Sequence, residues 1–236
     1  SITPKSLNRN NIQTIQPENT QQSVQSQITN TVQINQTQYQ TIAEALESAQ
    51  NGDTITLLED VSLTDEVIIG KEKNIKINLN GKTLTSTSNN TINNQGILTI
   101  KGTGIIKNEI ENGIVIYNTG SLNMEDGVVT TAENGGKAIS NNGDGSNYQG
   151  SDTNNVEKSG TVNIKSGKIV TEGIGAIGLY NANNAKANIS GGIFETRNYA
   201  SKAMDNDSEL EIENAKVVGS DYDSIGIYNG KNSKSC

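Results

Sequence analysis

Residues 162–181 read VNIKSGKIVTEGIGAIGLYN and contain both features that predict the fold. Val162 and Ile164 stand two positions apart, and a third apolar residue follows five positions later, after a Ser-Gly pair. Apolar residues in alternation mark a β-strand with one buried face, and the third one starts the next strand after a turn. The segment ends on Leu179 and, two positions later, Asn181.

These two features recur six times along the chain. The predicted apolar triplets are Ile77, Leu79, Leu84; Leu98, Ile100, Ile105; Leu122, Met124, Val129; Val162, Ile164, Ile169; Ala187, Ile189, Phe194; and Leu210, Ile212, Val217. The asparagines are Asn94, Asn118, Asn141, Asn181, Asn206 and Asn229. From the middle residue of a triplet to its asparagine the distance is 15, 18, 17, 17, 17 and 17 residues. A distance that changes so little indicates a structural repeat.

The length of the repeat selects the fold. Consecutive triplets lie 21, 24, 40, 25 and 23 residues apart. Three short strands in such a unit, without a helical pattern, predict one coil of a single-stranded right-handed parallel β-helix, with coils about 4.8 Å apart. We therefore expect an all-β solenoid of about six to seven coils over residues 39–236. The 40-residue interval is expected to hold one ordinary coil and an inserted loop at residues 143–160.

The six asparagines are predicted to be structural. Asparagine tolerates the left-handed backbone of a tight turn, and its side-chain amide can bond to the equivalent amide of the next coil. We expect an asparagine ladder along the solenoid and no catalytic role for it.

The N-terminal part of the chain is expected to differ from the repeats. Ten of the first 40 residues are glutamine, so residues 1–38 are predicted to be a disordered polar leader. Thr41 and Glu44 form a capping box that starts a helix over residues 41–51, which would cover the open end of the solenoid. No comparable plug follows the last repeat, so the C-terminal end is expected to be uncapped and truncated, and to continue into further domains.

Composition restricts the partners. The chain has 26 acidic and 18 basic residues, net charge −8, so a nucleic acid is not expected as a partner. No apolar run reaches the roughly 20 residues of a membrane helix, so no membrane insertion is expected. Cys236 is the single cysteine, which excludes an intrachain disulfide.

Two segments resemble a known family. Asn51-Gly52-Asp53-Thr54-Ile55-Thr56-Leu57 and Ile77-Asn78-Leu79-Asn80-Gly81-Lys82-Thr83-Leu84, after the short helix, resemble the opening of pectate-lyase-like β-helix repeats in surface proteins and adhesins of low-GC Gram-positive bacteria. This resemblance implies a secreted or cell-surface location and, in many members, an adhesive or stalk-like role. The fold itself does not choose between adhesion and catalysis.

The chemistry of an enzyme is hard to assemble from this sequence. The chain has no histidine, which leaves carboxylate pairs as the hydrolytic option. The densest acidic cluster is Asp205, Asp207, Asp221 and Asp223, with Arg197 one coil away. It could form a metal site with a basic catalyst, or it could consist of surface ion pairs and solvated turns.

The inserted loop offers a second candidate site. Its residues Asp144, Asn147 and Asp152 could supply oxygen ligands to calcium, and Tyr148 could bind a partner. Without a complete pattern of spaced ligands, an unstructured surface loop is the competing interpretation. No other cofactor is expected.

A column of tyrosines is the third candidate. Tyr117, Tyr180 and Tyr228 each precede a ladder asparagine and are expected to point outward. Exposed tyrosines can stack on sugar rings or bind a partner protein, although they are also common surface residues of strands. From these features we expect a non-catalytic adhesive or structural module that binds a glycan or an extracellular protein. The alternative is a lyase or glycoside hydrolase that acts on an acidic polysaccharide.

Overall fold

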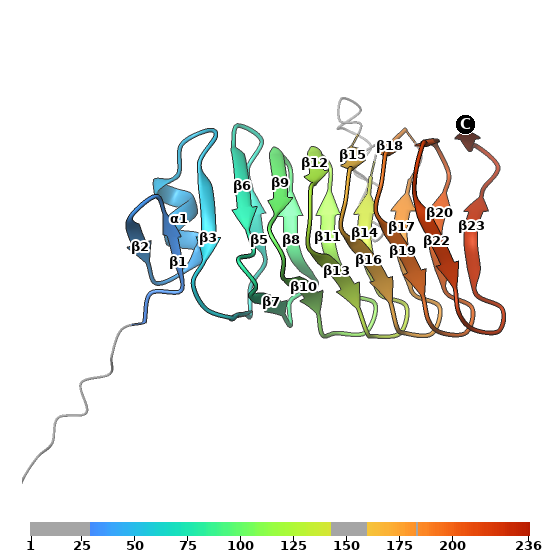
Figure 1. Ribbon diagram of the computed structural model, residues 1–236, viewed down its shortest axis with the longest axis horizontal. Helices are drawn as coiled ribbons and strands as arrows, with labels where there is room; N and C mark the ends of the chain where they lie inside the picture. The colour runs from blue at the N-terminus through green and yellow to red at the C-terminus, as the bar shows by residue number, and fades with distance from the viewer. Residues whose placement is uncertain (1–28, 143–159, 183) are drawn as a thin grey trace, which may run out of the picture.

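The computed structural model describes residues 29–142, 160–182 and 184–236, and these form one elongated stack of β-coils (Figure 1). Each coil contributes one strand to each of three sheets, and equivalent strands of neighbouring coils pair in parallel. Seven coils follow one another, so the predicted all-β parallel solenoid is confirmed.

The three sheets, here named A, B and C, run along the whole stack. Sheet A contains β2 (Thr37–Tyr39), β1 (Val32–Ile34), β3 (Thr54–Leu57), β6 (Asn74–Asn78), β9 (Ile97–Lys101), β12 (Ser121–Met124), β15 (Thr161–Ile164), β18 (Lys186–Ile189), β21 (Glu209–Ile212) and β24 (Lys234–Ser235). Sheet B contains β4 (Val61–Leu63), β7 (Thr83–Ser86), β10 (Ile105–Asn108), β13 (Val128–Thr131), β16 (Lys168–Thr171), β19 (Ile193–Thr196) and β22 (Lys216–Gly219). Sheet C contains β5 (Val67–Ile69), β8 (Asn90–Asn94), β11 (Ile114–Asn118), β14 (Lys137–Asn141), β17 (Ile177–Asn181), β20 (Lys202–Asn206) and β23 (Ile225–Asn229).

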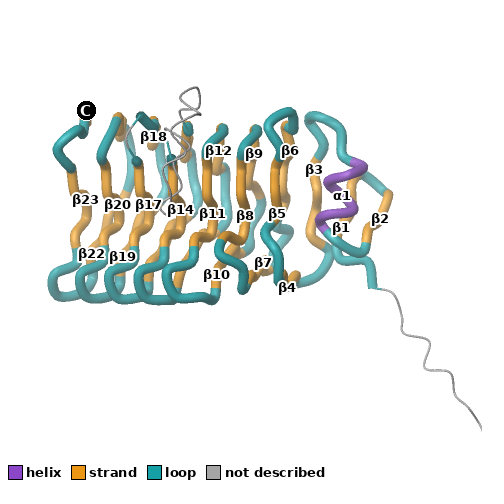
Figure 2. The backbone as a smooth tube through the Cα atoms, turned by 180° about the vertical axis from the view of Figure 1, so that it is seen from behind, coloured by secondary structure: helices purple, strands orange, loops and turns teal. Residues whose placement is uncertain are grey.

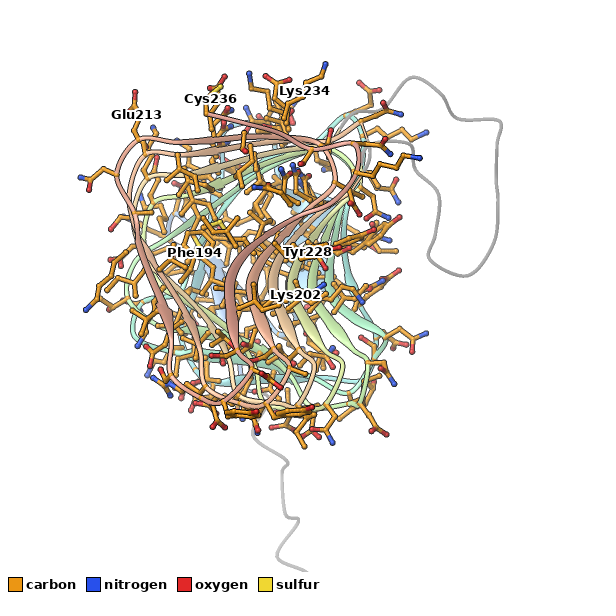
Figure 3. All side chains as sticks on the ribbon, turned by 90° about the vertical axis from the view of Figure 1, so that its right-hand side faces the viewer. Phe194, Lys202, Glu213, Tyr228, Lys234 and Cys236 are labelled. Carbon is orange, nitrogen blue, oxygen red and sulfur yellow. The ribbon has the colours of Figure 1, made fainter. Side chains whose placement is uncertain are left out.

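Alternating side chains fill the interior. Figure 3, which looks along the stack from its C-terminal end, shows Phe194 inside the ring of sheets and Tyr228 on its outer surface. Phe194 has no exposed surface, whereas Tyr228 is 46% exposed. The core is therefore a narrow column of aliphatic side chains, which explains how a chain with only 32% hydrophobic residues folds.

The predicted triplets are correct in most coils and shifted in two. Ile75 and Ile77 pair with Leu98 and Ile100. The residues equivalent to the later triplets therefore lie two positions earlier than the predicted Ile77 and Leu79. The interval to the next coil is thus 23 residues, counted from Ile77 to Ile100, rather than 21.

The second error concerns the start of β10. Ile105 is 37% exposed, whereas Ile106 is fully buried and pairs with Leu84 and Val129. Two consecutive isoleucines allow either to face inward, and only the pairing with neighbouring coils decides which one does.

The N-terminal end of the stack is closed by a helix and a hairpin (Figure 2). Helix α1 (Ile42–Ser48) starts at Thr41, whose side chain accepts a hydrogen bond from the Glu44 backbone N–H. The carboxylate of Glu44 accepts one from the backbone of Gln40, so the capping box is present with that small change. The helix ends at Ser48, three residues before the predicted end, with Ala49 as its C-cap, and it is the only helix in the described ranges given above.

The boundary of the predicted leader at residue 38 is wrong. β1 and β2 form an antiparallel hairpin, and β1 also pairs antiparallel with β3, the first strand of the solenoid. Val32 is fully buried and Ile34 nearly so, because they extend the apolar core below α1. Residues 1–28 lie outside the described part of the chain.

The other end of the stack carries a more exposed coil. Ile225 and Ile227 of β23 are 38% and 41% exposed, and β24 pairs with β21. That further coils or domains follow stays a prediction. None of the helices in the described residues is long and apolar enough to cross a membrane.

Candidate binding groove

The six predicted asparagines form a ladder at the corner where sheet C turns into sheet A. Each side-chain amide donates to the next asparagine: Asn94 to Asn118 (2.7 Å), Asn118 to Asn141 (2.9 Å), Asn141 to Asn181 (2.9 Å), Asn181 to Asn206 (2.8 Å) and Asn206 to Asn229 (3.0 Å). The second amide proton binds a backbone carbonyl, such as that of Lys186 for Asn141 at 2.9 Å. The ladder is therefore structural, as predicted.

One reason given for the ladder is wrong. The asparagines with left-handed backbone are Asn35, Asn80, Asn112 and Asn184, and none of these belongs to the ladder. The ladder asparagines are the last residues of the sheet C strands, and all of them are buried except Asn229 on the exposed last coil. Asparagine is required there for its amide, which both donates and accepts, and not for its backbone.

A groove of about 1070 Å³ runs along the outside of sheet C, from β8 to the segment after β23. Its floor is made of outward side chains: Asn90, Ile114, Tyr117, Lys137, Ser140, Ile177, Tyr180, Asp205 and Tyr228. One wall is the turn from sheet B, with Ile110, Glu111, Asn112, Gly135 and Gly175. The other wall is the turn towards sheet A, with Asn142, Asp207, Gly230 and Lys231.

The three predicted tyrosines lie in one column on this floor. Strand pairing aligns Tyr117, Ser140, Tyr180, Asp205 and Tyr228 on successive coils. The exposure of the three tyrosine side chains rises along the groove, from 8% for Tyr117 through a half-buried Tyr180 to 46% for Tyr228. The geometry places them together, and their role in binding stays a prediction.

A second outward column lies three residues earlier in each strand. Pairing aligns Ile114, Lys137, Ile177, Lys202 and Ile225. Sequence reasoning missed this column, although the signal was present: each tyrosine of the groove has an isoleucine three positions before it.

The polar side chains of the floor are held by one another. The Asn142 amide donates to the hydroxyl of Tyr117 at 3.1 Å, and the Ser140 hydroxyl donates to Asn142 at the same distance. Lys202 forms a 2.5 Å ion pair with Asp205 and lies 4.3 Å from the ring centroid of Tyr228 (Figure 3). These contacts restrict the orientation of the Tyr117 hydroxyl and of the Tyr228 ring.

Lys137 is the titratable group that the groove perturbs most clearly. Burial lowers the pKa of the Lys137 ammonium, and the charge of Asp205 partly opposes this by raising it. Loss of hydration thus disfavours the charged form of Lys137, whereas the carboxylate of Asp205 favours it.

The predicted acidic cluster does not assemble with Arg197. Arg197 instead forms ion pairs with Glu172 (2.6 Å) and Glu195 (2.7 Å) on the outside of sheet B. Asp205 belongs to the groove, and Asp221 and Asp223 lie in an exposed turn. Within the part of the chain that the structure covers, no three His, Cys, Asp or Glu side chains lie close enough together to hold a metal ion.

The predicted calcium ligands Asp144, Asn147 and Asp152, and also Tyr148, lie outside the described residues. The chain leaves and re-enters the solenoid beside the groove, because Gly160 donates to the carbonyl of Asn142 at 3.2 Å. The inserted loop therefore starts at the wall of the groove. Calcium binding there stays a prediction.

Two further tyrosines are exposed outside the groove. Tyr199 and Tyr222 stack on each other at the turn between sheets B and C, with ring centroids 6.4 Å apart and planes at 10°. They are 48% and 77% exposed.

Comparison of the chain with known protein families, with curated proteins and with solved structures gives no match.

Proposed function

We propose that this protein is a non-catalytic binding module that holds a linear glycan along sheet C. The observation that supports this is the groove itself, about 1070 Å³ in volume and lined by three tyrosines, of which Tyr180 and Tyr228 are accessible from outside. A tyrosine presents both a flat apolar face and a hydroxyl, so it suits sugar rings, which have apolar faces and polar edges. A rigid stack of coils keeps these side chains at constant spacing.

The proposal includes an extracellular location on a bacterial surface. It is motivated by the resemblance of the first repeats to those of Gram-positive surface proteins. A rod built of stacked coils also suits a surface protein, because it can present a lateral groove far from its attachment point. Partners other than a glycan, such as an extracellular protein, remain alternatives that a broad array can reveal.

A glycan and extracellular-matrix array, probed with the whole chain, tests this function. We expect saturable binding to extended polysaccharides, and about a tenfold loss or more in Tyr180→Ala, because an aromatic contact of this kind contributes on the order of 1–2 kcal/mol. Tyr199→Ala is the matched control, since it removes an exposed ring outside the groove. Parallel arrays with calcium and with a chelator test the inserted loop. Equal binding by both variants, or no binding to any polysaccharide, would contradict the proposal.

A polysaccharide lyase is the second candidate, and Lys137 is the observation that favours it. A lysine with a lowered pKa can act as a general base that removes the proton from the carbon next to a sugar carboxylate. The test is the absorbance of unsaturated products after incubation with acidic polysaccharides. Turnover that disappears in Lys137→Gln would establish the enzyme, whereas binding without turnover would establish the module.

A further inference from the structure

The turns that lead from sheet B into sheet C have the same structure on the last two coils. In each turn, the side chain of an Asn or Asp accepts a hydrogen bond from the next backbone N–H: Asn198 from Tyr199 at 2.8 Å, and Asp221 from Tyr222 at 2.7 Å. The serine three positions later donates its hydroxyl to the carbonyl of the same Asn or Asp. The residue after each tyrosine has a left-handed backbone. Both turns therefore hold their tyrosine in the same backbone geometry.

Strand pairing brings the two tyrosines together. β19 pairs with β22 before the turns and β20 pairs with β23 after them, so Tyr199 and Tyr222 occupy equivalent positions on neighbouring coils. Their rings are nearly parallel, at 10°, with centroids 6.4 Å apart. At this separation the facing ring edges are close to van der Waals contact, which for carbon atoms is about 3.5–4.0 Å. Because the side chains are 48% and 77% exposed, a reagent in solution reaches both phenols.

This arrangement differs from that of the groove. In the described part of the chain, each of the other tyrosines has a residue of another kind beside it on the neighbouring strand. Ser140 separates Tyr117 from Tyr180, and Asp205 separates Tyr180 from Tyr228. Among the described residues, two phenols thus meet on adjacent coils only at the turns of the last two coils.

We propose that Tyr199 and Tyr222 are a site of oxidative cross-linking, at which a haem peroxidase with hydrogen peroxide joins the two rings as dityrosine. The oxidant removes one electron and one proton from each phenol, and hydrogen peroxide is reduced to two molecules of water. The two phenoxyl radicals combine through the ring carbons next to their C–O carbons, which forms one carbon–carbon bond. Each of these carbons then loses its proton and each oxygen gains one, so both phenols are restored and the protein has lost two hydrogen atoms.

The new bond ties the exposed last coil to the coil before it. Ile225 and Ile227 of β23 are 38% and 41% exposed, so this coil has few apolar contacts to hold it closed. A covalent link between Tyr199 and Tyr222 closes a loop in the opened state, as a disulfide does, and therefore disfavours opening of the coil. The inference does not depend on the proposed function.

Treatment of the whole chain with a haem peroxidase and hydrogen peroxide tests the inference. Dityrosine is detected by its fluorescence, and mass spectrometry of a proteolytic digest locates the bond in joined peptides. We expect dityrosine between Tyr199 and Tyr222 of one chain, and hydrogen exchange in β22 and β23 that is about tenfold slower or more. Tyr222→Phe keeps the ring but removes the phenol, so it should lose this product. Tyr228→Phe should not, because Tyr228 is similarly exposed (46%) but has Asp205 on the adjacent coil.

Ile174 allows the product to be restored, since it occupies the same turn position one coil before Tyr199 and is 48% exposed. Ile174→Tyr in the Tyr222→Phe background should again give dityrosine within one chain, now with Tyr199. Dityrosine that forms only between chains, or that persists within the chain in Tyr222→Phe, overturns the inference. No dityrosine from an oxidant that converts free tyrosine also overturns it. Unchanged hydrogen exchange after cross-linking overturns the stabilisation of the last coil.

Discussion

Replacement of Asn118 by alanine removes one amide from the middle of the ladder. Asn118 is fully buried; it donates to Asn141 at 2.9 Å and to the Thr161 carbonyl at 3.1 Å, and it accepts from Asn94 at 2.7 Å. Each lost hydrogen bond costs about 1 kcal/mol, and buried partners left unsatisfied cost more, so we expect a loss of about 3–5 kcal/mol. For a domain of this size that lowers Tm by roughly 6–20 °C.

The outer surface of sheet A provides a matched control. Asn163 also donates to one asparagine, Asn123 (3.0 Å), and accepts from another, Asn188 (2.8 Å), but water can reach it. Asn163→Ala is therefore expected to cost about 1 kcal/mol or less, because water replaces the lost partners. Thermal and urea denaturation, followed by circular dichroism, measures both variants. A cost for Asn118→Ala no larger than that for Asn163→Ala would refute the argument that burial gives the ladder its strength.

Three further predictions concern other parts of the solenoid. Ala200 has a left-handed backbone (φ 53°), as does Gly175 on the preceding coil (φ 64°). Ala200→Gly should therefore stabilise the protein by about 0.5–1 kcal/mol in urea melts, and Gly175→Ala should destabilise it by the same amount. Hydrogen bonds from an arginine and a lysine lower the pKa of Glu195 to about 2. The stability contributed by this ionised carboxylate should be full above pH about 4.5 and fall towards pH 2. Thermal melts of Glu195→Gln should lack this loss. Lys73 donates to the Ala49 carbonyl at 2.8 Å at the end of α1, and Lys73→Met should increase hydrogen exchange in α1 by about fivefold or more, with later coils unchanged.

The repeats could be predicted from sequence because the two landmarks of each coil have different chemistry. An inward asparagine cannot be exchanged for an aliphatic residue, so its position is unambiguous, and all six asparagines were assigned correctly. The aliphatic landmarks are less certain where several stand together. Ile75, Ile77 and Leu79 all alternate, and all three are fully buried, so only strand pairing shows which two are equivalent to Leu98 and Ile100.

The ends and the groove were harder to predict for physical reasons. The hairpin of β1 and β2 has few apolar residues, and it is held by antiparallel pairing to β3, a long-range contact that leaves no periodic signal. The outward direction of Tyr117 follows from strand alternation, but its 8% exposure depends on neighbours from adjacent coils. The groove itself is produced by the two turns that border sheet C, and turn geometry is not encoded in the strand pattern.

The ladder and the groove are opposite faces of the same strand ends. Each outward residue of the tyrosine column is followed directly by a ladder asparagine, as in Tyr117–Asn118 and Tyr180–Asn181. Hydrogen bonds of 2.7–3.0 Å between the side-chain amides of successive asparagines hold these strand ends at one fixed interval. Since neighbouring residues in a strand point to opposite faces, the same interval is imposed on the outward column. Under the proposed function, a ligand that matches this spacing over several coils would depend on an interior structure that it never contacts, so the regularity of the buried ladder would determine specificity on the surface.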